Sequence, residues 1–460
     1  MSGLRILYHM ARADFLERAR RDSFLVVVGL VVFLGYQVNT GVVARYLDQY
    51  RGVFNSAWVG SMMTVVGTFF LGWFGFYLVK GSIARDYDTG VGQIVATTPL
   101  TRPQYVLGKW LSNLAVLAAM LAILAGAGLV LQVIQREDAR LDLLAFFAPF
   151  LWVGLPALAL VAALAVLFDT VGWLRGGLGN VIYFFLFSFT PFLAFEEVAI
   201  PAAAEPLGLK LFYAEMGAAA RQAFPDYSGG FSIGSSDRVV VGTFLWEGVD
   251  WTADRLAWRL ALVGAAAVVV LGAAALFDRF DTAQARRNPR PQDEEPAGGR
   301  ATGPPAPPMP AALSPTPSGF SLVSIWRAEL KLMLKGQRWW WYAGAALFVM
   351  LGLFNDAGRV REAVLMLTWV WPTLIWSSLG MREARHATGQ MVFSAPNPLT
   401  RQLPAAWLAG ATLAALTGGG AGLRLLLSGD GQGLAMWLAA VVFIPSLALA
   451  GGVWSGTSKL

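Results

Sequence analysis

Long apolar runs separated by short polar segments dominate the chain. Ten of these runs are read as membrane-spanning helices: residues 23–37, 59–79, 110–133, 143–168, 177–196, 256–277, 340–354, 362–380, 405–427 and 434–454. A helix needs about 20 residues to cross the hydrocarbon core of a bilayer, where its backbone hydrogen bonds must be satisfied internally. The pattern therefore predicts an all-α polytopic membrane helix bundle with about ten transmembrane helices.

Basic residues are unevenly distributed around the first predicted span. Five arginines precede it and two follow it: Arg5, Arg12, Arg18, Arg20 and Arg21, against Arg45 and Arg51. Because Lys and Arg favour the cytoplasmic side of short loops, we expect a cytoplasmic N-terminus. The formal net charge of +6 is then explained by topology and by contact with membrane lipid headgroups, and no nucleic acid is expected as a partner.

A polar, proline-rich segment divides the chain. Residues 281–320 contain 10 of the 23 prolines, and no aromatic residue lies between Phe280 and Phe320. Too few apolar groups are present to offset the entropy lost on ordering, which predicts a disordered cytoplasmic linker. We expect a first half of six spans at residues 1–280 and an apparently incomplete second half of four spans at residues 321–460.

The two halves resemble each other in their order of features. Each begins with an amphipathic stretch, RADFLERARR from Arg12 and RAELKLMLKGQR from Arg327, expected to form a cytoplasmic connecting helix. The fourth span of each half contains an internal proline, Pro156 or Pro445. Repeated membrane halves are typical of transporters, because such halves can move against each other around a central path.

A short polar cassette occurs once in each half. Residues 89–102 read TGVGQIVATTPLTR and residues 388–401 read TGQMVFSAPNPLTR, a constant offset of 299. Thr-Gly is expected to start a short helix, and proline to end it, since the residue before proline avoids the α region. Apolar side chains on that helix and an arginine at the lipid boundary would then face a partner. The residues concerned are Thr89, Gly90, Ile94, Pro99 and Arg102 in the first cassette, and Thr388, Gly389, Phe393, Pro398 and Arg401 in the second.

The sequence offers little chemistry of its own. Cysteine is absent, the two histidines lie far apart, and no G-x-x-x-x-G-K-[ST] phosphate-binding loop occurs. We therefore expect no catalytic, metal or cofactor-binding residues. Charged residues are expected only near span ends, with Arg259 reaching the outer surface. Glu196 and Glu197 are candidates for an outer exit.

The outer segment between the fifth and sixth spans, residues 198–254, is expected to lie at the membrane surface. Trp246 and Trp251 suit the lipid headgroup level, where amphipathic rings are favoured. Either a lid without substrate contact or short interfacial helices fit this segment.

The cassettes carry a resemblance to a known family. KGSIARDYDTGVGQIVATTPLTRPQYVLGK, and again MREARHATGQMVFSAPNPLTRQLPAAWLAG, resemble the loop after the second span in permease subunits of ABC-2-type ABC transporters. The resemblance implies a multi-pass permease of a bacterial-type inner (plasma) membrane, an exporter coupled to a separate cytosolic P-loop ATPase. Two cassettes imply two ATPase copies, which would bind ATP and Mg, and the shorter second half implies a second permease chain. The second cassette lacks the lysine that follows the first at Lys109.

Two other classes stay open. An ion-coupled secondary transporter would require a titratable side chain at mid-membrane depth. A non-transporting membrane scaffold or assembly protein would use the cassettes only to recruit a partner. The substrate is not specified by any motif.

Overall fold

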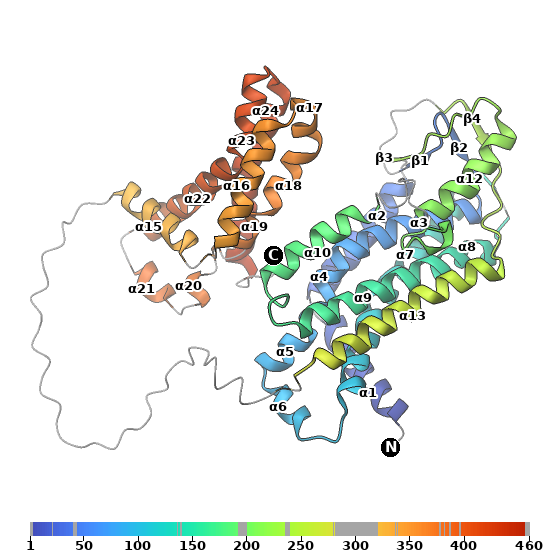
Figure 1. Cartoon of the computed structure of the whole chain (residues 1–460), viewed down its shortest axis with the longest axis horizontal. Helices are drawn as coiled ribbons and strands as arrows, with labels where there is room; N and C mark the ends of the chain where they lie inside the picture. Colours follow the sequence, from blue (N-terminus) through green and yellow to red (C-terminus); the bar gives the residue numbers. More distant parts are fainter. Residues whose placement is uncertain are drawn as a thin grey trace, which may run out of the picture. The chain divides into compact units, whose positions relative to one another are not determined.

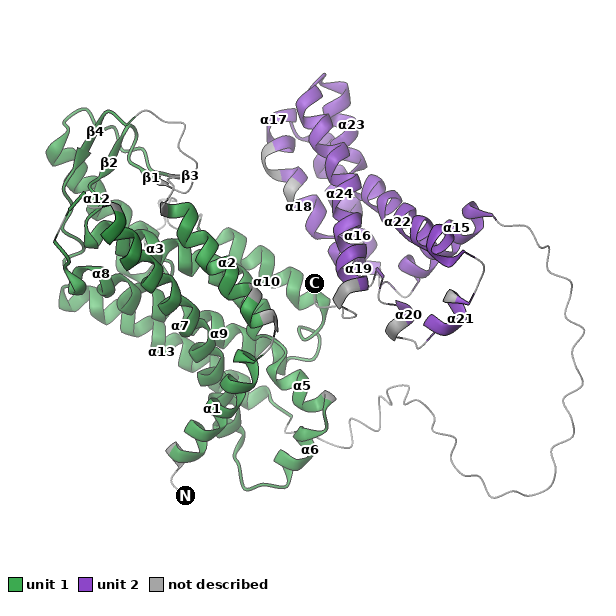
Figure 2. Cartoon of the chain, turned by 180° about the vertical axis from the view of Figure 1, so that it is seen from behind, with its two compact units in different colours: residues 1–295 green, residues 296–460 purple. Residues whose placement is uncertain are grey.

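Two compact units make up the chain, Met1–Glu295 and Pro296–Leu460 (Figure 2). The computed structural model describes residues 3–20, 22–39, 44–135, 137–138, 140–191, 200–234, 240–278, 280, 321–335, 337, 339–376, 379–380, 382–385, 388–394 and 397–455. The linker predicted at 281–320 and the candidate exit residues Glu196 and Glu197 lie outside the described residues.

The first unit is a helix bundle with a small amount of strand (Figure 1). Its helices are α1 (Gly3–Ala19), α2 (Asp22–Asn39), α3 (Ser56–Phe70), α4 (Phe76–Val79), α5 (Ser82–Asp88), α6 (Val91–Ala96), α7 (Arg102–Gln135), α8 (Leu143–Pro149), α9 (Leu155–Thr170), α10 (Gly177–Phe189), α12 (Leu209–Ala223) and α13 (Ala253–Leu276). A contiguous apolar core joins α3, α7, α9 and α13.

The second unit is smaller and also helical. It contains α15 (Leu322–Leu334), α16 (Trp339–Phe354), α17 (Ala357–Arg359), α18 (Leu365–Val370), α19 (Thr373–Trp376), α20 (Arg382–Arg385), α21 (Gly389–Phe393), α22 (Pro398–Thr417), α23 (Gly419–Leu427) and α24 (Gly431–Ser455). Its own apolar core contains several tryptophans, among them Trp341, Trp369 and Trp376.

Among the residues that the structure describes, five helical segments are long and apolar enough to cross a membrane: Ser56–Tyr87, Arg102–Ile134, Leu143–Thr170, Ala253–Leu276 and Gly431–Val453. A sixth span is possible if Pro398–Thr417 and Gly419–Leu427, which are bent by 61°, count as one. Three shorter apolar helices lie at Val27–Val38, Gly177–Phe189 and Trp339–Phe354. The chain is thus a multi-pass helical membrane protein, while the arrangement of ten spans as six plus four stays a prediction.

Two predicted spans of the second half are interrupted. The run 362–380 forms a π-helical turn (Val360–Val364), then α18, a break and α19. Pro372 explains the break, because proline has no N–H and its ring clashes with the carbonyl of the preceding turn. The run 405–427 bends at Gly418 because three consecutive glycines there lower helix propensity and leave room for a kink.

Two π-helical turns also interrupt the spans of the first unit, at Leu71–Gly75 and Phe150–Gly154. The second lies just before Pro156, whose missing N–H favours a local change of hydrogen bonding. In the first, the Tyr183 hydroxyl donates a 2.6 Å hydrogen bond to the carbonyl of Gly72, while the Tyr183 ring stacks on Phe76. Such turns are commonly found at functional positions of helices.

The helical fold also contains two short strand pairs that the sequence did not predict. Strand β1 (Ala44–Tyr46) pairs antiparallel with β3 (Ser232–Gly234), and β2 (Tyr50–Gly52) pairs parallel with β4 (Gly242–Phe244). These strands lie at the end of the unit opposite α1 and α6 (Figure 1). Because the paired strands are far apart in sequence, local periodicity cannot reveal the pairing.

Two predictions for this end of the unit are wrong. Trp246 is only 4% exposed and packs edge-on against Trp58, so its ring is covered by protein and is not free to contact lipid headgroups. The side chain of Arg259 does not extend to the surface but is fully buried, where Nη1 donates to the carbonyl oxygen of Glu205. Both are covered by the segment around α12, which packs onto the loop after α2.

Candidate functional site

The first cassette forms a short helix, α6, and a left-handed glycine precedes both this helix and α5 before it. Gly81 (φ +87°) precedes α5, and Gly90 (φ +75°) is the N-cap of α6. Glycine adopts positive φ without the steric cost that other residues meet. The Thr-Gly pair therefore starts α6 as predicted, with Gly90 and not Thr89 at the cap.

The start of α5 is fixed by a carboxylate from the end of α9. Asp169, which is buried, accepts hydrogen bonds from the backbone N–H groups of Gly81 (2.9 Å) and Ile83 (3.2 Å) and from the hydroxyl of Ser82 (3.3 Å). An anionic acceptor at a helix N-terminus satisfies free backbone donors and interacts favourably with the helix dipole. The cassette loop is thereby attached to the end of a buried helix.

Helix α6 has one packed face and one exposed face. Gly92 packs so closely on Phe280 that an added Cβ would lie 2.3 Å from Cδ1 of that ring. On the other face Ile94 is 67% exposed and Val91 is 43% exposed. An exposed apolar face on a short rigid helix is available for contact with another molecule.

The helix that follows each cassette begins at a different residue of the Pro-Leu-Thr-Arg motif. In the first, Thr101 and Gln104 form a reciprocal capping box at the start of α7, with Pro99 exposed in the loop and Arg102 exposed as the first helical residue. In the second, Pro398 is the first residue of α22 and Asn397 adopts a left-handed conformation. Pro398 therefore begins α22, and the preceding helix α21 has already ended at Phe393.

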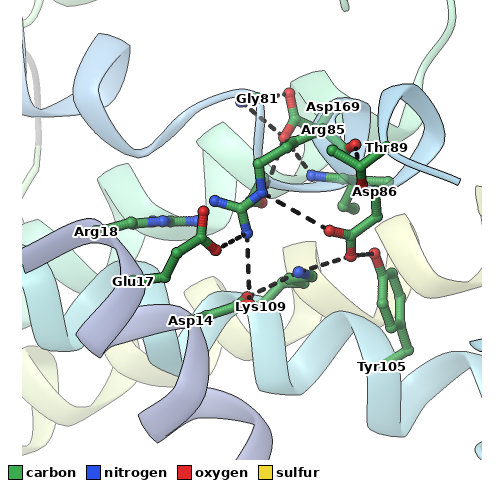
Figure 3. Close-up of polar contacts among 12 residues, drawn as sticks. Asp14, Glu17, Arg18, Gly81, Arg85, Asp86, Thr89, Tyr105, Lys109 and Asp169 are labelled. Carbon is green, nitrogen blue, oxygen red and sulfur yellow. Dashed lines mark hydrogen bonds and ion pairs between the residues drawn. The ribbon is translucent and has the colours of Figure 1, made fainter. Parts of the chain in front are cut away.

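A polar cluster, buried at Asp86, Tyr105 and Lys109, connects the first cassette to the rest of the unit (Figure 3). We define this first polar cluster as Asp14 and Glu17 of α1, Arg85 and Asp86 of α5, and Tyr105 and Lys109 of α7. Three carboxylates surround two cations. The cluster therefore joins three helices that are distant in sequence.

Lys109 is the centre of this cluster. Its Nζ lies 2.7 Å from Oδ2 of Asp14 and 2.7 Å from Oδ2 of Asp86, and its side chain is only 3% exposed. The Tyr105 hydroxyl donates a 2.6 Å hydrogen bond to the same oxygen of Asp86. Arg85 completes the arrangement by pairing with Glu17 at 2.8 Å and lying 3.5 Å from Asp14. A buried charge is tolerated when it is paired in this way.

Helix α1 is packed tightly on α7 beyond the cluster. Arg18 Nη1 donates a 2.6 Å hydrogen bond to Oδ1 of Asn113. A Cβ on Gly108 would lie 1.7 Å from the Cε atom of Met10, so the glycine permits the close approach of the two helices. The amphipathic stretch at Arg12 thus forms a helix that lies against a membrane-spanning segment.

The second cassette also forms a short helix, α21, whose N-cap is Thr388. Gly389 is the first residue of α21, and the side chain of Phe393 lies outside the described part of the structure. Met391 is 72% exposed on this helix. Arg401 lies in the first turn of α22 and is half-buried.

A second polar cluster lies beside this cassette. We define it as Glu329 of α15, Arg382 of α20 and Gln402 of α22. Oε2 of Glu329 lies 3.0 Å from Nη1 of Arg382, and Oε1 accepts a 2.6 Å hydrogen bond from Nε2 of Gln402. The Trp326 indole N–H also donates to the hydroxyl of Thr412, which links α15 to α22 a second time.

The sequence identified the cassettes but not the polar clusters beside them. Of the residues in these clusters, the cassette comparison singles out only Lys109. One signal for the others was present: Asp14 and Glu329 occupy the same place in RAD and RAE, the openings of the two amphipathic stretches. Within the described residues, no group of three or more His, Cys, Asp or Glu side chains is arranged to hold a metal ion.

Comparison with known proteins identifies one family. The model of the ABC-2 family transporter protein matches residues 8–282, more than half of the chain and nearly all of the first unit. No curated protein and no solved structure matches the chain. The matched region includes α1, the first cassette and the first polar cluster. The chain therefore belongs to the ABC-2 family of transporter proteins.

Proposed function

We propose that this chain is the membrane-spanning permease subunit of an ATP-driven ABC exporter. In this proposal α6 and α21 lie on the cytoplasmic side and contact a separate cytosolic ATPase, one copy for each cassette. The partner binds ATP and Mg²⁺. ABC-2 permeases generally associate with an ATPase subunit, which supports the first step of this proposal.

The observation that carries the proposal is the connection from α6 to the bundle. Helix α5, which directly precedes α6, is joined to α1 by Arg85 and to α7 by Asp86 and Tyr105. Its own start is capped by Asp169 at the end of α9. Movement imposed on the exposed face of α6 would therefore be passed to α1, α7 and α9 together, as a coupling element requires.

The second unit supports a matching role for the second cassette. Glu329 connects α15 to α20 and α22, as Asp14 connects α1 to α5 and α7. In each unit an acidic residue of the amphipathic helix contacts an arginine from the loop helix and a polar residue from the next long helix. This correspondence favours an internal repeat with two cassettes acting in parallel.

The cassette residues take distinct roles in this mechanism. Gly90 and Gly389 shape the starts of the two short helices, and Pro99 and Pro398 set the path into the next long helix. Ile94, with the neighbouring apolar residues, provides the contact surface for the ATPase. Arg102 and Arg401 lie where the following helix begins. In this proposal they pair with lipid headgroups or with carboxylates of the partner.

Photo-crosslinking from single cysteines tests the proposal directly. The natural chain has no cysteine, so Thr97→Cys and Asn397→Cys each provide one attachment site at an exposed position of a cassette. Glu247→Cys, exposed at the strand end of the first unit, is the matched control. We expect a cytosolic P-loop ATPase to be captured from Thr97→Cys and Asn397→Cys and not from Glu247→Cys. Capture of lipid alone from both cassettes would exclude their role in coupling.

Transport measurements separate the two alternatives. A secondary transporter would continue without ATP and stop when the ion gradient is dissipated. A scaffold would bind the ATPase without any transported compound that stimulates hydrolysis. An exporter is expected to lose transport when ATP is withdrawn, whatever the state of the gradient.

A further inference from the structure

Arg45 of β1 is a buried cation that has no carboxylate partner among the described residues. Its Nη1 donates a 3.1 Å hydrogen bond to the hydroxyl of Ser61 and lies 3.0 Å from Sδ of Met216, a thioether that accepts only weakly. Nε and Nη2 have no acceptor in the described part of the chain. Burial lowers the pKa of the Arg45 guanidinium to about 9, because the charged form loses water without gaining an anion.

Helix α12 covers this guanidinium at the strand end of the first unit (Figure 1). The buried face of α12 includes Phe212 and Met216, and the Phe212 ring centroid lies 5.9 Å from Cζ of Arg45. The ring of Trp58 on α3 lies at 5.2 Å from the same atom. Aromatic rings attract a cation, but less strongly than the water that it loses on burial. Closure of α12 therefore covers a charge that it compensates only in part.

A second arginine lies under the turn that precedes α12. Arg259 is fully buried, and its Nη1 donates a 2.8 Å hydrogen bond to the carbonyl oxygen of Glu205. Its Nε and Nη2 also have no acceptor among the residues that the structure describes. The carboxylate of Glu205 instead accepts hydrogen bonds from the backbone N–H groups of Leu207 and Lys210. The segment around α12 thus buries two guanidinium groups whose donors are incompletely satisfied.

The polar contacts that hold this segment in place lie near the surface. Gly208, directly before α12, has a φ of +73°, which glycine adopts without steric cost. On α12 itself, Glu215 forms an ion pair with Arg255. Beyond its end, the hydroxyl of Ser228 donates a 2.9 Å hydrogen bond to Asp48. Contacts of this kind contribute little where water can replace them, so the apolar face of α12 provides most of the closure.

We propose that α12 is a displaceable cover at the strand end of the first unit, and that Arg45 sets the balance between its closed and open positions. In the closed position Arg45 has given up water without gaining a carboxylate. In the open position water reaches its free N–H groups. The charge of Arg45 therefore favours opening, while the apolar residues of α12 favour closure. The inference does not depend on the transport function proposed above.

Single cysteines can report this opening, because the natural chain contains none. Ala220→Cys is the reporter: Ala220 lies on the buried face of α12, so the thiol reacts with a water-soluble maleimide only when α12 is displaced. Ala218→Cys, exposed on the same helix, gives the rate of an uncovered thiol. Ala266→Cys, buried on α13, gives the rate that unfolding of the unit alone produces. Each variant is made in the full chain and studied in lipid nanodiscs.

We expect Ala220→Cys to react more slowly than Ala218→Cys and faster than Ala266→Cys. Arg45→Met keeps a long side chain but removes the charge. It should slow the reaction of Ala220→Cys by at least about tenfold, which corresponds to about 1.4 kcal/mol in favour of the closed position. Arg45→Lys keeps the charge, so Ala220→Cys should react at least as fast in that background as beside Arg45. Ala218→Cys should react equally in all three.

A change in the opposite direction would overturn the proposal. Faster reaction of Ala220→Cys in the Arg45→Met background, or loss of the folded protein, would show that the charge stabilises the closed position. An unchanged rate would show that Arg45 does not act on α12. Reaction of Ala220→Cys no faster than that of Ala266→Cys would show that α12 opens only when the whole unit unfolds.

Discussion

Lys109 on α7 and Asp14 on α1 form an ion pair of 2.7 Å across 95 residues of sequence. The lysine lies seven residues inside a long apolar helix, and it is held there by two carboxylates and the phenol that shares Asp86. The pair fixes the amphipathic helix α1 to α7. Any movement that separates α1 from α7 must break this pair and expose a charge that has few alternative partners.

Lys109→Met is expected to destabilise the first unit. Removing one member of a buried ion pair leaves its partners poorly compensated and typically costs about 3–5 kcal/mol. Here Asp14 and Asp86 would share only Arg85, at the longer distances of 3.5 and 3.9 Å. The measurement is thermal unfolding of the purified protein in lipid nanodiscs. Lys109→Arg keeps the charge and is expected to lose much less. In the double variant Asp14→Asn/Lys109→Met the two losses should not add, because the residues are in contact. Additive losses would show that the pair is energetically unimportant.

The long helices of the bundle could be predicted from the sequence because apolar length is a local property. The runs 59–79, 110–133 and 143–168 lie within the helical segments Ser56–Tyr87, Arg102–Ile134 and Leu143–Thr170. The extra residues at the ends include polar and charged ones, among them four of the first polar cluster: Arg85, Asp86, Tyr105 and Lys109. A hydropathy pattern identifies only the apolar part of a helix, so the predicted runs stop before these polar residues.

Asp169→Ala tests the attachment of the first cassette to α9. This carboxylate caps α5, and loss of a cap typically costs about 1 kcal/mol, so the bundle should remain folded. Hydrogen exchange should become faster at the amides of Gly81 and Ile83, which lose their acceptor. Asp142→Ala is the matched control, because Asp142 caps α8 through the amide of Ala145. Asp142→Ala should accelerate exchange only at the amide of Ala145. Faster exchange at Gly81 in Asp142→Ala would contradict the assignment of Asp169 as the cap of α5.

Ile94→Asp should separate ATPase binding from stability. The side chain of Ile94 is 67% exposed, so a carboxylate at this position is hydrated. The free energy of unfolding should therefore stay within about 1 kcal/mol of the wild-type value. Binding to the partner should weaken by at least about tenfold, because an apolar contact is replaced by a charge. The measurement is co-purification of the ATPase with the permease from solubilised membranes.

Leu245→Asp provides the control for this variant. Leu245 is similarly exposed but lies beside β4 at the opposite end of the first unit. It should leave ATPase binding unchanged. If Ile94→Asp and Leu245→Asp co-purify the ATPase equally well, α6 is not the contact surface.

The contacts between distant segments could not be predicted from the sequence. The pairing of β1 with β3 and the burial of Trp246 depend on how residues 200–234 and 240–252 fold back onto the loop after α2. A single sequence does not show which partner an interfacial tryptophan or a span-end arginine meets. Arg259 illustrates this point: its position near a helix end suggested exposure, but Glu205 and the neighbouring segment cover it.

Glu329 is expected to give the second unit a pH dependence that Glu329→Gln removes. Burial raises the pKa of the Glu329 carboxyl, and nearby Glu383 adds to the rise, while Arg382 and the hydrogen bond from Gln402 oppose it. A pKa that is higher in the folded than in the unfolded protein means that folding favours the protonated form. The contribution of Glu329 to stability is therefore fully present below the usual glutamate pKa near 4.5 and is lost as the pH rises through the raised value.

The measurement is thermal unfolding of the wild type and Glu329→Gln in nanodiscs between acidic and neutral pH. Relative to Glu329→Gln, the wild type should become less stable as the pH rises, because only the wild type must then keep a buried carboxylate charged. Arg382→Gln should steepen this dependence, since it removes the cation that lowers the pKa of Glu329. A constant difference across the pH range would show that the carboxyl of Glu329 is not perturbed. If Glu329→Gln loses transport but gains stability at neutral pH, the charge of Glu329 serves coupling at the expense of the folded state.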